Sequence, residues 1–130
     1  MLDLNQFFQS GDWKGEKHVP YIEVNGEMKK GEFFNVHIFV GKEIPHPNTT
    51  EHHIKWISLY FHPEGEKFPY EIGKVEFNSH GESTQGPNTS TIYTNPKVIF
   101  SMKTEKNGKL IAFSYCNIHG LWSNSIDIKF

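Results

Sequence analysis

The sequence contains no arginine, and only one alanine and one cysteine occur among its 130 residues. All 13 basic residues are therefore lysine, and the formal net charge is -2 with histidine neutral. Proteins that bind nucleic acid usually carry a basic surface and use the planar guanidinium group of arginine to contact phosphates and bases. The composition argues against nucleic acid as a partner.

Long apolar segments are absent as well, since the longest unbroken run covers residues 110–113. A membrane-spanning helix needs about 20 apolar residues, and a signal peptide needs an apolar region of at least about 7. The single cysteine cannot form a disulfide within the chain, which fits a reducing compartment. We therefore expect a cytoplasmic protein without membrane contact, folded as a single domain over residues 1–130.

Strand-forming residues dominate what is present. Val, Ile, Thr and the aromatic residues together number 44, whereas Ala, Leu and Met together number nine. Apolar and polar residues alternate over 34–40 and 97–103, as expected for half-buried strands. Further strands are predicted at 21–24, 54–61, 72–77, 91–94, 110–116 and 125–130. The pattern predicts an all-β protein, an immunoglobulin-like antiparallel β-sandwich of about seven strands.

Two connections between these strands stand out. Asn107-Gly108 lies between two extended apolar stretches, a pattern that predicts a β-hairpin. Residues 78–90 are mostly polar, contain glycine and proline, and show no periodicity, so they are predicted to form a long loop.

Eight histidines are present beside only five leucines, and those of chemical interest fall into three segments. His18 follows Glu16 and Lys17, His46 and His52 lie in a proline-containing stretch, and His119 follows Cys116 by three residues. Each segment lies at a predicted strand end or in a loop, where the ends of different strands can meet. Taken singly, each also fits a plainer interpretation, a buried structural thiol or solvated histidines.

If the segments converge, they offer four imidazoles and one thiolate, with a carboxylate near by. Structural zinc takes four ligands, and magnesium and calcium prefer oxygen, so this donor set favours iron. A cupredoxin-like electron-transfer sandwich with copper is an alternative, although the axial methionine typical of such sites does not follow His119. A metal-free β-sandwich binding module is a second alternative.

The three segments, in this order, resemble superoxide reductases of the one-iron neelaredoxin type, which are related to the catalytic domain of desulfoferrodoxin. The resemblance runs from about residue 14 to the end of the chain. It implies a seven-stranded immunoglobulin-like sandwich and an enzyme that reduces superoxide to hydrogen peroxide without releasing oxygen. The rubredoxin-like centre of the two-iron relatives uses four cysteines and cannot be built here.

The resemblance also implies the site and the partners. It implies a mononuclear non-haem iron, alternating between Fe2+ and Fe3+, whose ligands in this chain are His18, His46, His52, His119 and Cys116. Glu16 would occupy the sixth position when the iron is oxidised, and Lys17 would attract superoxide. A rubredoxin-like protein would return the electron, and a homo-oligomer, a dimer or tetramer, is expected. His53 matches no ligand position and is expected to face outward.

Overall fold

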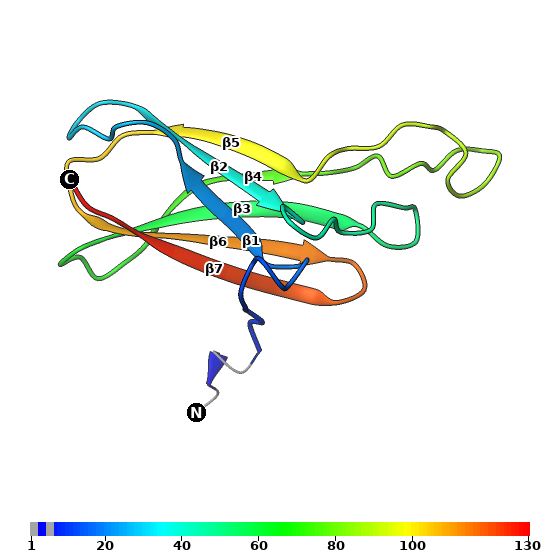
Figure 1. Ribbon diagram of the computed structural model, residues 1–130, viewed down its shortest axis with the longest axis horizontal. Helices are drawn as coiled ribbons and strands as arrows, with labels where there is room; N and C mark the ends of the chain where they lie inside the picture. Colours follow the sequence, from blue (N-terminus) through cyan, green and yellow to red (C-terminus); the bar gives the residue numbers. More distant parts are fainter. Residues whose placement is uncertain (1–2, 5–6) are drawn as a thin grey trace.

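The computed structural model describes residues 3–4 and 7–130, and in this part of the chain seven strands form two antiparallel sheets (Figure 1). The smaller sheet has the order β1-β2-β5 and the larger one the order β4-β3-β6-β7. The strands are β1 (Pro20–Val24), β2 (Phe34–Val40), β3 (Ile54–Pro63), β4 (Tyr70–Glu76), β5 (Lys97–Met102), β6 (Gly108–Cys116) and β7 (Gly120–Ile128). The predicted all-β sandwich of about seven strands is confirmed.

The core lies between the two sheets and follows from the alternation along each strand. Val36 and Ile38 on β2 face Ile57 and Leu59 on β3 and Leu110 on β6, and all five side chains are fully buried. Because successive side chains of a strand point to opposite faces, one face of each sheet supplies this core. Described residues form no helix long and apolar enough to cross a membrane.

The predicted hairpin at Asn107-Gly108 is wrong. The strands on either side of this dipeptide belong to different sheets, since β5 pairs with β2 and β6 pairs with β3 and β7. Glycine is needed at position 108 because β3 lies very close to it, and not because the chain turns tightly there. A Cβ at this position would collide with the backbone oxygen of His62 and the ring of Phe61. The hairpin of this region joins β6 to β7 instead.

The prediction of a strand at residues 91–94 is also wrong. Only an isolated bridge between His80 and Tyr93 forms there, and Thr91 has a positive φ of 64° that interrupts an extended chain. The long loop predicted at 78–90 therefore continues to the start of β5. In contrast, β7 begins five residues before its predicted start at residue 125, because pairing with β6 orders residues 120–124, which lack a clear alternation.

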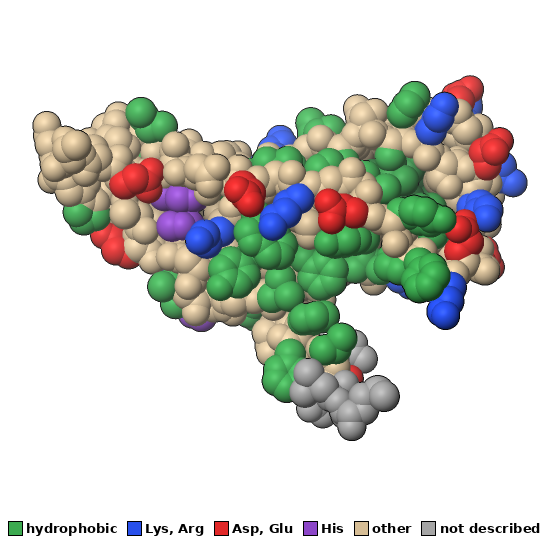
Figure 2. Space-filling view, turned by 180° about the vertical axis from the view of Figure 1, so that it is seen from behind, with side chains coloured by type: hydrophobic (Ala, Val, Ile, Leu, Met, Phe, Trp, Pro, Cys, Tyr) green, Lys and Arg blue, Asp and Glu red, His purple; other side chains and the backbone are tan. Residues whose placement is uncertain are grey.

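The outer face of the larger sheet is unusually aromatic. Trp56 stacks on Tyr115 with ring centroids 5.7 Å apart, and Tyr60 meets Phe113 edge to face at 5.8 Å. We call these four residues the outer aromatic face. Phe8 of the N-terminal segment packs on Phe113. Figure 2 shows hydrophobic side chains gathered on one side of the molecule, above this N-terminal segment.

Candidate metal centre

Donor atoms of four residues lie together at one end of the sandwich. One ligand atom from each of His18, His52, Cys116 and His119 lies within 4.8 Å of the other three. The topology explains this convergence. His18 lies just before β1, His52 just before β3, Cys116 ends β6 and His119 lies just before β7. Three of the four residues, His52, Cys116 and His119, thus lie at the ends of neighbouring strands of one sheet.

The spacing of these atoms suits a single ion. His18 Nε2 lies 3.1 Å from His119 Nδ1, and two imidazole nitrogens bound at right angles to one ion at about 2.1 Å would be about 3.0 Å apart. Cys116 Sγ lies 3.8 Å from His119 Nδ1 and accepts a hydrogen bond of 3.4 Å from the backbone N–H of His119. Sulfur and nitrogen therefore face a common point.

His46 stands outside this group of four but borders it. Its ring centroid lies 4.8 Å from those of both His18 and His52, and only 8% of the residue is exposed. Its Nδ1–H donates to the Pro47 carbonyl oxygen at 2.6 Å. The Nε2 atoms of His46 and His52 are buried without a hydrogen-bond partner among the described residues. A buried polar nitrogen without a partner lowers the stability of the folded state. A bound metal ion would give both nitrogens a partner.

The electrostatics keep these imidazoles neutral. Burial lowers the pKa of His46 to about 4, against the opposing hydrogen bond to Pro47, and the charge of Lys17 and the nearby imidazoles of His18 and His52 further disfavour a proton there. Burial likewise lowers the pKa of His52, and Lys17 and the neighbouring imidazoles act in the same direction. Because metal ions bind the neutral imidazole, these groups are ready to act as ligands near neutral pH.

Glu16 contacts His18 rather than the four donor atoms. Its Oε1 accepts hydrogen bonds from His18 Nδ1 at 2.6 Å and from the His18 backbone N–H at 3.0 Å. Burial raises the pKa of Glu16, but these hydrogen bonds and the charges of His18 and Lys17 outweigh it and hold the pKa below its usual value. A carboxylate on Nδ1 orients the ring and leaves the Nε2 lone pair free for a metal.

Three residues without an assigned role in the sequence analysis support the site. The Trp122 ring stacks on His18 at 4.8 Å between centroids with an interplanar angle of 15°. Ser114 donates to the His18 carbonyl oxygen at 2.9 Å. Asn117, in the turn between Cys116 and His119, accepts a hydrogen bond from the His53 N–H and donates to the Glu51 carbonyl oxygen, both at 2.9 Å. Asn117 lies between Cys116 and His119, and Trp122 follows His119 by three residues, so closeness to these two predicted ligands was their only signal in the sequence.

His53 was expected to face outward. It is not one of the clustered donors, but it is only partly exposed, and its ring lies flat on that of His80 with centroids 3.5 Å apart. His53 therefore packs against a neighbouring loop instead of standing free in solvent.

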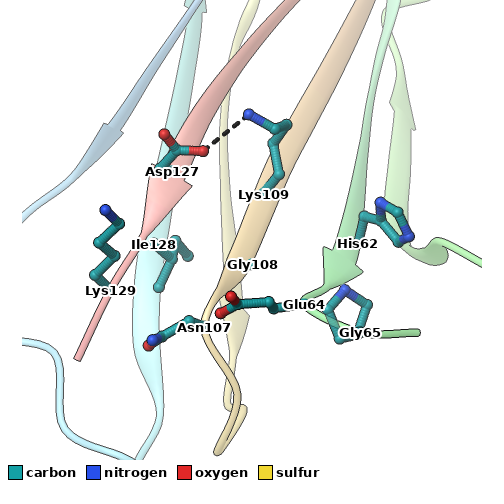
Figure 3. Close-up of a pocket in the computed structure, with 10 residues that line it drawn as sticks. His62, Glu64, Gly65, Asn107, Gly108, Lys109, Asp127, Ile128 and Lys129 are labelled. Carbon is teal, nitrogen blue, oxygen red and sulfur yellow. Dashed lines mark hydrogen bonds and ion pairs between the residues drawn. The ribbon is translucent and has the colours of Figure 1, made fainter. Parts of the chain in front are cut away.

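A separate pocket lies at the opposite end of the larger sheet (Figure 3). His62, Glu64, Asn107 and Lys109 are among its lining residues, and Lys109 Nζ forms an ion pair of 2.8 Å with Asp127. The register places Gly108 opposite Pro63 and Ile128 at this end, whereas Cys116 lies opposite Ile54 and Gly120 at the other. The pocket is therefore remote from the metal centre.

The fold and the donor set define a class, a β-sandwich protein with a mixed histidine and cysteine metal centre. The sequence profile of the desulfoferrodoxin family matches residues 10–125, and the chain belongs to this family.

Individual relatives agree with this assignment. A superoxide reductase of Pyrococcus furiosus is 60% identical over 126 residues, which cover 97% of this chain and 99% of that protein. Neelaredoxin of Megalodesulfovibrio gigas is 56% identical over 124 residues, 95% of each chain. The solved structure of superoxide reductase (neelaredoxin) from Archaeoglobus fulgidus in the reduced form superposes with a TM-score of 0.88 at 59% identity, covering 95% of this chain and 98% of that one.

Proposed function

We propose that this protein is a superoxide reductase that converts superoxide to hydrogen peroxide at a mononuclear iron. The observation that carries the proposal is the clustering of His18, His52, Cys116 and His119 within 4.8 Å, in a chain 60% identical to a superoxide reductase over nearly its whole length. We assign His46 as the fifth ligand on the strength of its buried, unpaired Nε2.

When bound, the iron would supply one electron to superoxide, which takes up two protons to become hydrogen peroxide without release of oxygen. The residues of the chain prepare this reaction. The Cys116 sulfur is fully buried, and as a thiolate bound to iron it would be an anionic, electron-rich donor. Glu16 fixes the orientation of His18 through a 2.6 Å hydrogen bond.

Lys17 is assigned to guiding the substrate. Its positive charge is close enough to lower the pKa of both His46 and His52. A cation beside the donor cluster attracts a small anion such as superoxide and raises its rate of encounter. Glu16 is assigned a second task, as a ligand of the oxidised iron, for which its carboxylate must leave His18.

The electron is proposed to come from a separate rubredoxin-like protein. Residues 1–130 contain one cysteine, whereas a rubredoxin-like centre uses four, so the proposal places that centre outside these residues. We further propose that one domain over residues 1–130 carries the activity and that it works in the cytoplasm, where a lone thiol stays reduced.

A homo-oligomer, a dimer or tetramer, completes the proposal. The outer aromatic face is a broad apolar surface, and Leu4 and Phe7 on the adjoining N-terminal segment are 54% and 56% exposed. Apolar surfaces of this kind are typical of interfaces between subunits. Sedimentation of the protein should give a multiple of the 15.1 kDa chain mass, and a stable monomer would contradict this part of the proposal.

Product stoichiometry tests the activity. Iron-loaded, reduced protein should yield one hydrogen peroxide per superoxide consumed and no oxygen, as long as reduced iron remains. Release of oxygen with half as much peroxide would indicate dismutation instead. Metal analysis of the purified protein separates the alternatives, since one iron per chain is expected, and copper without peroxide formation would indicate an electron-transfer protein.

A further inference from the structure

The long loop over residues 78–96 lies at the same end of the sandwich as the metal centre (Figure 1). It packs against residues 46–53, the segment that carries His46 and His52. This segment belongs to no strand, so no sheet ladder fixes its position. His46 and His52 nevertheless hold buried, unpaired Nε2 atoms, which would gain hydrogen bonds if the side chains turned toward water. Contacts outside the sheets must therefore hold the segment in place.

Asn117, in the turn between β6 and β7, provides some of these contacts, and Asn88 of the long loop provides others. Asn88 Oδ1 accepts a hydrogen bond from the Thr50 backbone N–H at 2.9 Å, and the Asn88 backbone N–H donates to Thr50 Oγ1 at 3.0 Å. Its Nδ2 donates to both carboxylate oxygens of Glu51, at 2.9 and 3.1 Å. Four hydrogen bonds thus join one asparagine to the two residues that precede His52.

The backbone of Asn88 is suited to this task. Its φ of 59° lies in the left-handed region, which asparagine tolerates better than most residues with a side chain. That conformation directs both the amide side chain and the backbone N–H toward Thr50 and Glu51.

Neighbouring contacts extend the same attachment. Thr50 Oγ1 donates to the His80 carbonyl oxygen at 2.6 Å, and Asn48 Nδ2 donates to the Thr94 carbonyl oxygen at 3.1 Å. The His53 ring stacks on His80, which is 4% exposed and hydrogen-bonded through Nε2 to the Phe77 carbonyl oxygen at 2.7 Å. The loop therefore contacts the ligand-bearing segment along most of its length.

We propose that Asn88 is a positioning residue for the metal centre, which holds residues 50–52 so that His52, together with His46, stays in ligand geometry. The inference rests on the proposed iron-binding role of these two histidines. It also gives the long polar loop a function, as a second support, beside Asn117, for a segment that belongs to neither sheet.

The rate of iron loss to a ferrous chelator tests this role in the iron-loaded protein. Asn88→Gly removes the side chain while keeping the left-handed backbone, and iron should leave about tenfold faster. Ser83→Ala is the matched control, because its hydroxyl bonds stay within the same loop, to Thr89 and Gln85. This control should release iron at the wild-type rate.

Moving the negative charge from Glu51 to position 88 distinguishes a positioning role of Asn88 from a general effect on stability. Asn88→Asp places a carboxylate against Glu51 and should speed iron loss, whereas the double variant Asn88→Asp/Glu51→Gln restores a donor and acceptor pair and should recover most of the wild-type rate. Glu51→Ala, at an exposed position, provides a milder test if Asn88→Gly does not fold. Hydrogen exchange at the Thr50 amide should increase in Asn88→Gly and recover in the double variant.

The outcomes are distinguishable. If wild-type protein retains iron but Asn88→Gly and Glu51→Ala lose it no faster than Ser83→Ala, the positioning role is refuted while the proposed function stands. Equal iron loss in Asn88→Asp and the double variant would likewise refute it. If the wild-type protein binds no iron at all, the proposed function itself fails.

Discussion

His18 Nε2 lies 3.1 Å from His119 Nδ1, although 101 residues separate the two in the chain. His18 precedes the first strand of the smaller sheet and His119 precedes the last strand of the larger one. Their contact therefore spans both sheets. The site depends on how the two sheets pack as well as on the identity of the ligands.

Replacing the thiolate tests the nature of the metal. A thiolate bound to ferric iron absorbs broadly at long wavelength, so oxidised wild-type protein should be blue and Cys116→Ser should lose the band. The visible spectrum, recorded before and after addition of a reductant, measures this. A much more intense band at the blue-copper position would instead indicate copper, and an unchanged spectrum in Cys116→Ser would exclude Cys116 as a ligand.

Removing the charge of Lys17 tests substrate guidance. Lys17→Met should lower the second-order rate with superoxide about tenfold or more at low ionic strength, because the anion loses an attractive charge, while the iron content stays unchanged. Pulse radiolysis measures the rate. Lys14→Met is the control, since Lys14 is exposed and lies over the Trp13 ring. Equal rates in both variants would refute the role of Lys17.

Glu16 can be tested for its two proposed tasks separately. Glu16→Ala should shift the spectrum of the oxidised protein while the initial rate with superoxide is retained. Loss of the hydrogen bond to His18 Nδ1 should also weaken iron binding about 10- to 100-fold, and Glu16→Gln, which keeps an acceptor, should weaken it less. A large loss of initial rate in iron-loaded Glu16→Ala would show that the carboxylate takes part in the chemistry.

Comparing alanine variants of two glycines with the same φ distinguishes the effect of backbone strain from that of a steric clash with His46. Gly41 and Gly26 both have φ of 83°, but a Cβ at Gly41 would lie 2.5 Å from the His46 backbone nitrogen, whereas Gly26 faces open space. Gly26→Ala should cost about 1 kcal/mol in the free energy of unfolding. Gly41→Ala should cost more and also reduce iron content, because His46 must shift. Metal analysis measures the iron content and thermal unfolding measures the stability. If the two variants have the same iron content and stability, His46 tolerates the displacement.

The buried histidines predict a pH dependence for protein from which iron has been removed. Burial lowers the pKa of His46 to about 4 and also lowers that of His80, whereas unfolded histidine titrates near 6.5. Between these values the unfolded state binds more protons, so stability falls as the pH falls. His46 alone should account for about 2 kcal/mol between pH 7 and pH 5. Denaturant unfolding at the two pH values measures this, and a flat profile would contradict the buried, neutral state of His46.

The sequence predicted the parts of the structure that depend on local pattern. Alternation located the strand containing Val36 and Ile38, an apolar stretch located the one containing Leu110, and three motifs selected the residues whose donor atoms meet. Which distant strands pair with each other was harder to predict from the sequence. Asn107-Gly108 is typical of a hairpin, but Gly108 is needed because the backbone of β3 lies too close for a side chain there. This close approach is visible only once the sheet has formed.

The supporting residues were hidden for the same reason. Asn88 lies in a polar stretch without periodicity, and nothing in that stretch indicates that its amide reaches Thr50 and Glu51. Trp122 lies close to the predicted ligand His119 in the sequence, but its stacking on His18 depends on β7 lying beside β1. Contacts of this kind are set by the topology rather than by neighbouring sequence.

The 101-residue separation of His18 and His119 has a consequence for biosynthesis. While a ribosome is still adding the residues of β6 and β7, the nascent chain can present His18, His46 and His52 but has no complete cage. Contacts between distant segments also form slowly, after the local ones. The complete donor set is therefore available to iron only when translation is nearly finished, and a chain truncated before Cys116 would offer iron neither the thiolate nor the imidazole of His119.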